Sequence, residues 1–287
     1  MRVPEPVVDP FEEELDPVYR MPVMLGRSSG PRNMPKSRKH LKYVGDSVSV
    51  NVTATVDETS MNALLPPGFK VTKNPRLLVG VTMLTNLGWL AGRGYNIIRV
   101  TTEVEVEAKR GPVVGNLALV LWENHPDPIL TGREELASPK LFANIPDARF
   151  VDDEVTATAD WEGFRFFELR ASKLTATALS PDTPTYAGGG AKPLICHRHH
   201  ASIGDWTKPA LAEIAISTPP EADMSVTLEH HVGVGEFAFH PARWEDMPTQ
   251  YTYVSTLARL PITGFCGASV VKARGIGDLA AMTTLPV

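Results

Sequence analysis

Lys140 is the residue of this sequence best suited to covalent chemistry. It lies in the segment GREELASPKLF, residues 132–142, directly after Pro139 and before Leu141 and Phe142. An ordinary lysine, with a pKa near 10.4, is protonated at neutral pH and is a poor nucleophile. Burial among apolar side chains, or a second cation nearby, lowers the pKa and releases the free amine. Such a lysine could form an imine with a carbonyl compound. Taken by itself, however, a lysine in a Pro-Lys pair more often caps a helix end or reaches the surface.

An imine enzyme also needs a group that moves protons and a group that holds the substrate. Arg133, seven residues before Lys140, could bind a substrate carboxylate, as could another cation. The general acid or base is left open, and Glu134 has the weakest claim because a structural role suits it better. The chemically eligible residues are Glu103, Glu105, Glu134, Tyr95 and Tyr253.

A second cluster of polar residues occurs in ICHRHHAS, which contains His197, His199 and His200. On a strand, His197 and His199 would face the same side, a spacing that metal sites use. A zinc site needs a third ligand, and no H-E-x-x-H or paired-cysteine motif supplies one. We therefore expect polar histidines and no metal.

Alternating apolar and polar residues dominate the chain and predict many strands. The stretch SVSVNVTATVD alternates in this way, and NIIRVTTEVEVEA followed by KRGP and GNLALVLW is typical of a hairpin. A second hairpin is predicted from VTATAD, the turn WEGF and RFFELRAS. Short helices are predicted in ETSMNALLPPGF, capped by Thr59 or Ser60, and in MPTQYTYVSTLARLP. The segment ENHPDPIL is predicted to be a turn.

The expected architecture is one α+β domain, residues 42–287, built on a mainly antiparallel sheet. Strands this numerous, with few helices between them, favour antiparallel pairing, and closing or curling the sheet protects its edges. Residues 1–41 contain seven prolines and are expected to form an arm on the surface or on a neighbouring subunit. A loop rich in glycine and proline is expected at residues 180–193.

Composition excludes several classes of function. The formal net charge is −5 and no basic stripe is visible, so nucleic acid is not expected as a partner. No apolar segment is long enough to span a membrane, and the N-terminus does not have the pattern of a signal peptide. The two cysteines, Cys196 and Cys266, are far apart and are expected to be reduced core thiols in a cytoplasmic protein.

The segment around Lys140 resembles the active-lysine segment of the acetoacetate decarboxylase-like superfamily. The likeness rests on Gly132-Arg133-Glu134 followed by Pro139-Lys140, and it extends to VDETSMNALLPPGF, RGYNIIRV and FHPARWEDMPTQYTYVSTLARLPI. It implies a cone-shaped antiparallel β-barrel with flanking helices, assembled into a homo-oligomer. It also implies that Lys140 is the Schiff-base residue and that no cofactor beyond this covalent imine is used.

Three positions depart from the decarboxylases of that superfamily. A second lysine follows the first in those enzymes and lowers its pKa, an effect that is a standard example for acetoacetate decarboxylase; here Leu141 occupies that position. A glutamate follows the tyrosine of the YN-type strand, but Ile97 follows Tyr95-Asn96 here. An early arginine of their pocket has no counterpart near Ser47.

These departures favour a lyase that keeps the imine and acts on a small oxo acid such as pyruvate. Relatives without those groups are associated with aldolase-dehydratase or hydratase reactions, in which an enamine attacks an aldehyde. The alternatives are an acetoacetate or other β-keto acid decarboxylase, and a small-ligand-binding barrel in which Lys140 only pairs with a carboxylate. The expected partners are a small oxo acid and an aldehyde.

Overall fold

The computed structural model describes residues 20–22, 30–31, 34–179, 192–217, 225–276 and 281–287. Most of the expected arm and of the loop at 180–193 therefore lies outside the described residues. Within the arm, Lys36–Leu41 forms a 3-10 helix, η3. A second 3-10 helix, η4, spans Gly88–Leu90.

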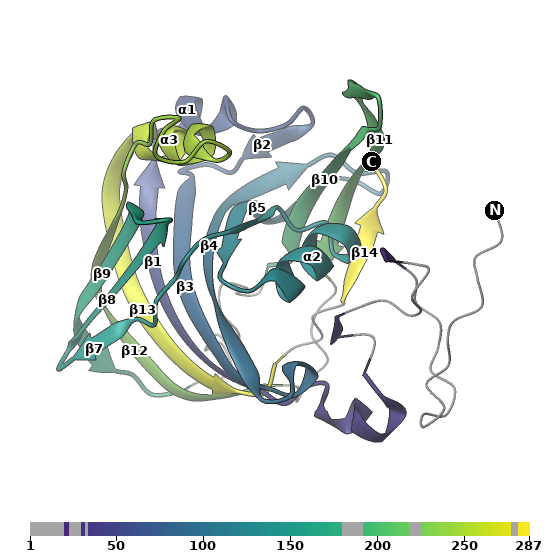
Figure 1. Cartoon of the computed structure of the whole chain (residues 1–287). Coiled ribbons are helices and arrows are strands. Elements are labelled where there is room, and N and C mark those ends of the chain that lie inside the picture. Colours follow the sequence, from purple (N-terminus) through teal and green to yellow (C-terminus); the bar gives the residue numbers. More distant parts are fainter. Residues whose placement is uncertain (1–19, 23–29, 32–33, 180–191, 218–224, 277–280) are drawn as a thin grey trace.

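One strongly curled sheet of 14 strands makes up the fold (Figure 1). Its hydrogen-bonded order is β14-β11-β10-β5-β4-β3-β1-β13-β12-β9-β8-β7, with β2 beside β4 and β6 beside β5. The strands are β1 Asp46–Val56, β2 Phe69–Val71, β3 Arg76–Leu87, β4 Arg93–Val106, β5 Val113–Glu123, β6 Lys140–Phe142, β7 Arg149–Val151, β8 Glu154–Trp161, β9 Phe164–Ala176, β10 Leu194–Ser202, β11 Asp205–Ser217, β12 Val226–Phe239, β13 Ile262–Arg274 and β14 Met282–Leu285.

The mainly antiparallel sheet is confirmed, with two parallel exceptions. β5 pairs in parallel with β10 at one end and with β6 at the other, and the remaining ladders are antiparallel. Among the described residues no ladder joins the two ends of the strand order. The structure therefore shows a curled sheet, and the closed cone-shaped barrel remains an expectation.

Both predicted hairpins form. β4 and β5 pair from Val106↔Val113 to Ile97↔Glu123, and β8 and β9 pair around the turn at residues 162–163. In that turn Gly163 has a φ of 93°, a conformation that glycine adopts without a steric penalty.

Three α-helices are described: α1 Glu58–Asn62, α2 Pro126–Glu135 and α3 Tyr251–Arg259. α1 and α3 lie where the sequence predicts helices, but Asp57, not Thr59 or Ser60, caps α1 by accepting from the Ser60 amide at 2.8 Å. The predicted turn ENHPDPIL is wrong, because most of it is the first part of α2. Pro126 at the first helical position is compatible with a helix start, where no amide donor is required.

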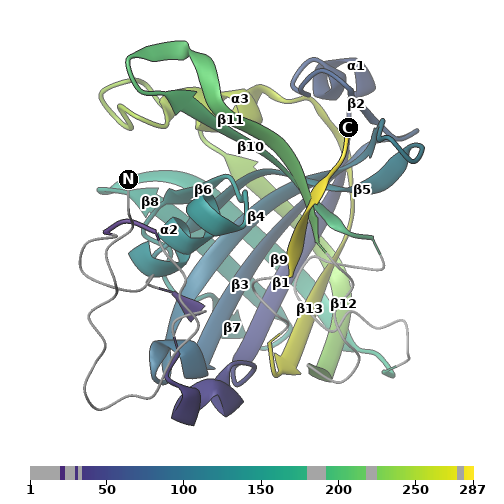
Figure 2. The same ribbon diagram turned by 90° about the vertical axis from the view of Figure 1, so that its right-hand side faces the viewer.

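The sheet carries two differently packed faces. The face that we call the α3 face bears Val50, Val79, Val100 and Trp122, which join α3 residues in the main apolar core. The opposite face, called the α2 face below, bears Tyr95, Ile97 and Leu121. Ala137, which follows α2, and Cys196 and Ala215 of β10 and β11 complete that smaller core. Figure 2 shows α2, β10 and β11 in front of β3 and β4.

Gln250, just before α3, connects the main core to the strands next to Lys140. Its side chain accepts a hydrogen bond from Trp122 Nε1 at 2.8 Å and donates one to the Phe142 carbonyl at 3.1 Å. Gln250 is buried, so these bonds satisfy a polar side chain that would otherwise be costly to desolvate. They hold β5 and β6 from the α3 face while their other face carries the polar groups described next.

Candidate active site

Lys140 is the first residue of β6 and lies next to Leu121 of β5 in the parallel ladder. Because neighbouring residues of paired strands project to the same side, Lys140, Leu121 and Glu123 share the α2 face. Leu141 projects to the opposite side and packs against the main core. The expectation that Leu141 and Phe142 shelter Lys140 is therefore wrong, since Leu141 faces the other core and Phe142 is 48% exposed.

The chain reverses direction at the end of α2, so that Lys140 lies beside this helix. Ala137 follows the helix with a φ of 60°, a left-handed conformation that costs an alanine about 1–2 kcal/mol. This reversal lets the Ser138 amide donate to the Gly132 carbonyl at 2.9 Å, while the Leu136 amide donates to the same carbonyl at 3.2 Å. The chain then returns along the helix, and β6 starts beside it.

The side chain of Lys140 lies against Gly132 of α2. A Cβ atom added at Gly132 would approach Lys140 Cδ to 2.3 Å and Cε to 2.4 Å, so only glycine leaves room for the lysine. Nζ donates a hydrogen bond to the Pro128 carbonyl at 3.0 Å. Lys140 is 9% exposed. The lysine is therefore packed along a helix groove and ends in the interior.

Glu123 is the carboxylate partner of Lys140. Its Oε1 lies 2.8 Å from Lys140 Nζ, and the residue is 0% exposed. Burial raises the pKa of Glu123 above its usual range, and the charges of Lys140, Arg99 and His125 partly oppose that increase. Neither oxygen has a hydrogen-bond donor of suitable geometry in the described part of the chain, although Oε1 is in ion-pair contact with Lys140. The site therefore contains a buried carboxylate whose raised pKa favours the protonated form and whose oxygens can still accept hydrogen bonds.

Arg99 and Cys196 complete the surroundings of the pair. Arg99 of β4 is opposite Leu121, projects to the α2 face and is 8% exposed. Cys196 of β10 is fully buried; burial raises the pKa of its thiol to about 11, against a hydrogen bond from Ser138 and the charges of Lys140 and Arg99. Cys196 is thus the expected core thiol, whereas Cys266 is exposed, contrary to that expectation.

Two of the expected residues lie near Lys140 without pointing into its surroundings. Arg133 is exposed, and its Nη1 donates to the backbone carbonyl of Lys140 at 2.9 Å. Glu134 lies 3.7 Å from Arg20 Nε in an ion pair at the end of α2. Tyr95 lies on the same face of the sheet as Lys140. It is buried there, with its ring centroid 6.4 Å from that of His125.

The other eligible acids and bases lie elsewhere. Glu103 is four residues beyond Arg99 on β4, about 13 Å along the strand. It pairs with Lys192, whose hydrogen bond lowers the pKa of the carboxyl. Glu105 pairs with Lys70 at 2.7 Å, and Tyr253 is an exposed residue of α3. The structure therefore brings Lys140 together with Glu123 and Arg99, neither of which the sequence indicated.

The histidines of β10 form no metal site in the described residues. His197 is partly buried, which together with His199 lowers its pKa, and its ring packs edge-on against Phe69 with centroids 6.0 Å apart. No group of three histidine, cysteine, aspartate or glutamate side chains within the described ranges is arranged to hold a metal ion.

None of the described helices is long and apolar enough to cross a bilayer.

Comparison with known proteins assigns the family. The sequence model of the family described as acetoacetate decarboxylase matches residues 20–275. The chain belongs to the acetoacetate decarboxylase family. No curated protein matches the sequence. The resemblance noted around Lys140 is therefore confirmed at the level of the family.

Solved structures of other members of the acetoacetate decarboxylase family share the fold at low sequence identity. The enduracididine biosynthesis enzyme MppR, complexed with the condensation product of pyruvate and imidazole 4-carboxaldehyde, is 16% identical with a TM-score of 0.59. That match covers 85% of this chain and 89% of MppR. An acetoacetate decarboxylase is 12% identical with a TM-score of 0.62, covering 85% and 89% of the two chains. An acetoacetate decarboxylase-like enzyme from Sphingomonas wittichii RW1 is 18% identical with a TM-score of 0.60, covering 85% and 92%.

Sequence reasoning missed Glu123 and Arg99 because both occur inside apolar strand patterns. The signal that could have found Glu123 is its position as the single acid at the end of GNLALVLWE, in a strand that is otherwise apolar there. Arg99 similarly interrupts the apolar run of NIIRV. A charge inside a buried strand is uncommon unless it is paired, so each was a candidate for a site.

Proposed function

We propose that this protein is a Schiff-base-forming lyase that acts on a small oxo acid, of the aldolase-dehydratase or hydratase type. The single observation that carries the proposal is the buried pair of Lys140 and Glu123, with Nζ and Oε1 2.8 Å apart. Membership of the acetoacetate decarboxylase family supports imine chemistry at Lys140. The solved complexes of MppR with pyruvate and with the condensation product of pyruvate and imidazole 4-carboxaldehyde support a 2-oxo acid as substrate.

The first step of the proposed reaction is a proton transfer from Lys140 to Glu123. The transfer leaves a neutral amine beside a neutral carboxylic acid. The 2.8 Å contact permits this transfer, and burial raises the pKa of Glu123, which favours the protonated carboxyl. The amine nitrogen then attacks the ketone carbon and passes one of its two protons to the ketone oxygen. Glu123 returns its proton to the same oxygen, which leaves as water.

The imine supplies the second step. Its positively charged nitrogen withdraws electrons from the substrate, so a proton on the neighbouring carbon becomes acidic. Glu123, deprotonated after water has left, accepts that proton and yields an enamine. The enamine carbon attacks the aldehyde carbon, the aldehyde oxygen takes up a proton, and loss of this oxygen as water gives a conjugated product. Hydrolysis of the imine releases the product and restores Lys140.

Chemical trapping tests this function. Pyruvate and cyanoborohydride are incubated with the protein, and the peptide containing Lys140 is weighed for the reduced adduct. We expect a stoichiometric adduct on Lys140 in the native protein, and none at that position in K140R, because a guanidinium is not a nucleophile. With an aldehyde present and no reductant, ultraviolet absorbance of a conjugated product reports the full reaction. An unmodified Lys140 in a protein that turns over pyruvate would refute the imine.

β-Keto acid decarboxylation is the second candidate within the same chemistry. Family membership favours it, and release of carbon dioxide from acetoacetate in place of pyruvate condensation would establish it. A ligand-binding role without chemistry is a further alternative. It predicts that K140R still binds pyruvate while no adduct forms on Lys140 of the native protein.

A further inference from the structure

Arg133 is not placed to hold the substrate of Lys140. Arg133 is exposed, and its guanidinium Nη1 donates a hydrogen bond to the backbone carbonyl of Lys140, outside the site. A carboxylate bound there would lie on the backbone side of Lys140, in water, where an ion pair is worth at most about 1 kcal/mol. The role that the sequence suggested for Arg133 therefore falls to another cation.

Arg99 has the position that Arg133 lacks. β4, β5 and β6 run side by side, with Arg99 opposite Leu121 and Leu121 next to Lys140. The Cα atoms of Arg99 and Lys140 are thus two strand spacings apart, about 10 Å. Both side chains project to the α2 face. Leu121 projects to the same face between them, so an acid held by both side chains would lie over Leu121.

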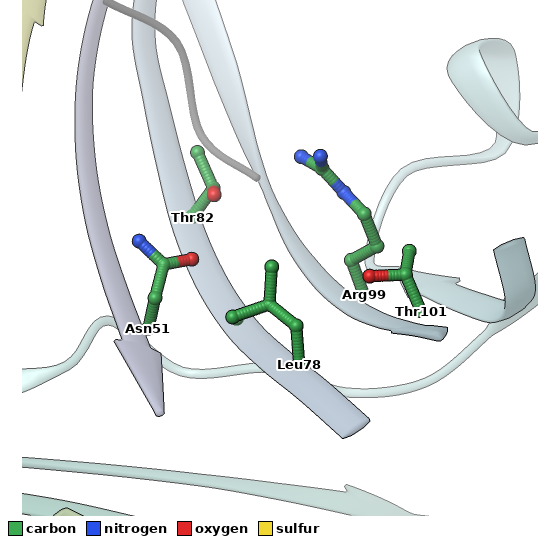
Figure 3. Close-up of a pocket in the computed structure, with 6 residues that line it drawn as sticks. Asn51, Leu78, Thr82, Arg99 and Thr101 are labelled. Atoms are coloured by element: carbon green, nitrogen blue, oxygen red, sulfur yellow. The ribbon is translucent and has the colours of Figure 1, made fainter. Parts of the chain in front are cut away.

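The surroundings of Arg99 are mainly polar. Arg99 lines a narrow pocket with Asn51, Thr82 and Thr101, which project from β1, β3 and β4 on the same face, and with Leu78 of β3 (Figure 3). The hydroxyl of Thr101 is buried and has no hydrogen-bond partner in the described part of the chain. Arg99 also interacts electrostatically with Glu123, so its charge acts at the centre of the site.

We propose that Arg99 binds the carboxylate of the oxo acid that forms the imine with Lys140, and so selects 2-oxo acids. This inference rests on the proposed function. A guanidinium presents two parallel donors that match both oxygens of a carboxylate, and the bond is strongest away from water. In a 2-oxo acid the carboxylate is attached to the imine carbon itself, so the two ends of a molecule as small as pyruvate can reach Arg99 and Lys140.

The same contact opposes decarboxylation. Loss of carbon dioxide removes the negative charge of the carboxylate, and an arginine that stabilises this charge in the ground state raises the barrier to its loss. Arg99 therefore favours products that retain the carboxyl group, in agreement with a condensation or hydration reaction.

A comparison of pyruvate with pyruvamide tests the role of Arg99. The two compounds share the ketone and the same shape, but pyruvamide has no charge. Rates of cyanoborohydride trapping at Lys140 are measured for the native protein, R99Q, R99K and R133Q. We expect R99Q to trap pyruvate about 100-fold more slowly, because a charged partner is lost, and to trap pyruvamide at nearly the native rate.

R133Q is the matched control. Arg133 holds the backbone of Lys140, so its loss should slow trapping of both compounds by the same factor and leave their ratio unchanged. R99K keeps the charge but not the paired donors, and should lower the pyruvate-to-pyruvamide ratio by about 10-fold. If R99Q does not fold, as judged by circular dichroism, the R99K ratio decides the question.

Each outcome has one meaning. If R99Q still traps pyruvate faster than pyruvamide, or traps both more slowly by the same factor, the proposed role of Arg99 is overturned. The proposed imine at Lys140 is not affected by that result. An unchanged ratio in R99K overturns it as well. A native protein that traps neither compound at Lys140 removes the proposed function itself, and the role of Arg99 with it.

Discussion

Ile97 and Glu123 face each other across β4 and β5. Ile97 occupies the position at which decarboxylases of this family were expected to carry a glutamate. The carboxylate is therefore present after all, but on the neighbouring strand, where it projects to the same face and pairs with Lys140 at 2.8 Å. Arg99, two residues after Ile97, places a buried cation on that face as well. The departures in sequence thus change which strands supply the charges around the lysine.

Replacing Glu123 by glutamine should stop the proton transfers. E123Q keeps the size of the side chain but removes the proton acceptor beside Nζ, and a general base contributes about 100- to 10,000-fold. We expect a loss of at least about 100-fold in the rate of product formation with pyruvate and an aldehyde. E103Q is the control, because Glu103 pairs with Lys192 away from the site. Equal rates in E123Q and the native protein would exclude Glu123 as the base.

Removing only Lys140 should destabilise the protein in a pH-dependent way. K140M leaves Glu123 buried without its ion partner, which costs about 3 kcal/mol when the carboxyl is ionised. Burial raises the pKa of Glu123 above its usual value near 4.5, so the folded state retains a proton that the unfolded state has released. The stability of K140M should therefore be greatest at acid pH and fall as pH rises above about 4.5 toward the raised pKa.

The double variant K140M/E123Q provides the comparison for this effect. It has no charge in the pair, so the extra decline with pH should disappear and most of the lost stability should return. Urea unfolding of the two proteins between pH 5 and 8 measures the difference. Parallel curves for the two variants would show that the pKa of Glu123 is not raised in folded K140M.

A methyl group at Gly132 should displace the lysine. The added Cβ of G132A would lie 2.3 Å from Lys140 Cδ, closer than side chains approach. Alanine favours a helix over glycine by about 0.5–1 kcal/mol, so α2 itself should not be weakened. We expect trapping of pyruvate at Lys140 to fall by 10-fold or more. L130A changes an exposed residue of the same helix and should trap normally; equal trapping in both variants would contradict the packing.

The two thiols should differ in reactivity. Burial raises the pKa of Cys196 to about 11, so about one thiol in a thousand is ionised at pH 8, and the residue is inaccessible. Cys266 is exposed. Iodoacetamide at pH 8 should therefore add one label to the native protein, on Cys266, and a second only after denaturation. Rapid labelling of Cys196 in the native state would show that β10 opens away from Ser138.

Local sequence patterns determined most of the secondary structure. The alternation in β1, the turn residues between β8 and β9 and the apolar periodicity of α3 each involve neighbours along the chain, so the sequence displays them directly. α2 was mistaken for a turn because its two prolines, Pro126 and Pro128, read as helix breakers, whereas prolines are tolerated in the first turn. The residues that precede Lys140 also indicated it as a candidate site residue.

The tertiary structure alone decided the partners of Lys140. Three features bring Glu123 and Arg99 to it: the register of β4 on β5, the parallel pairing of β6 with β5, and the left-handed Ala137 that ends α2. Strand register depends on packing between residues distant in sequence, and a one-residue slip would turn each side chain to the opposite face. Alanine gives no local sign of a left-handed conformation. The sequence therefore indicated Lys140 as the proposed nucleophile, and only the folded chain determined which charges surround it.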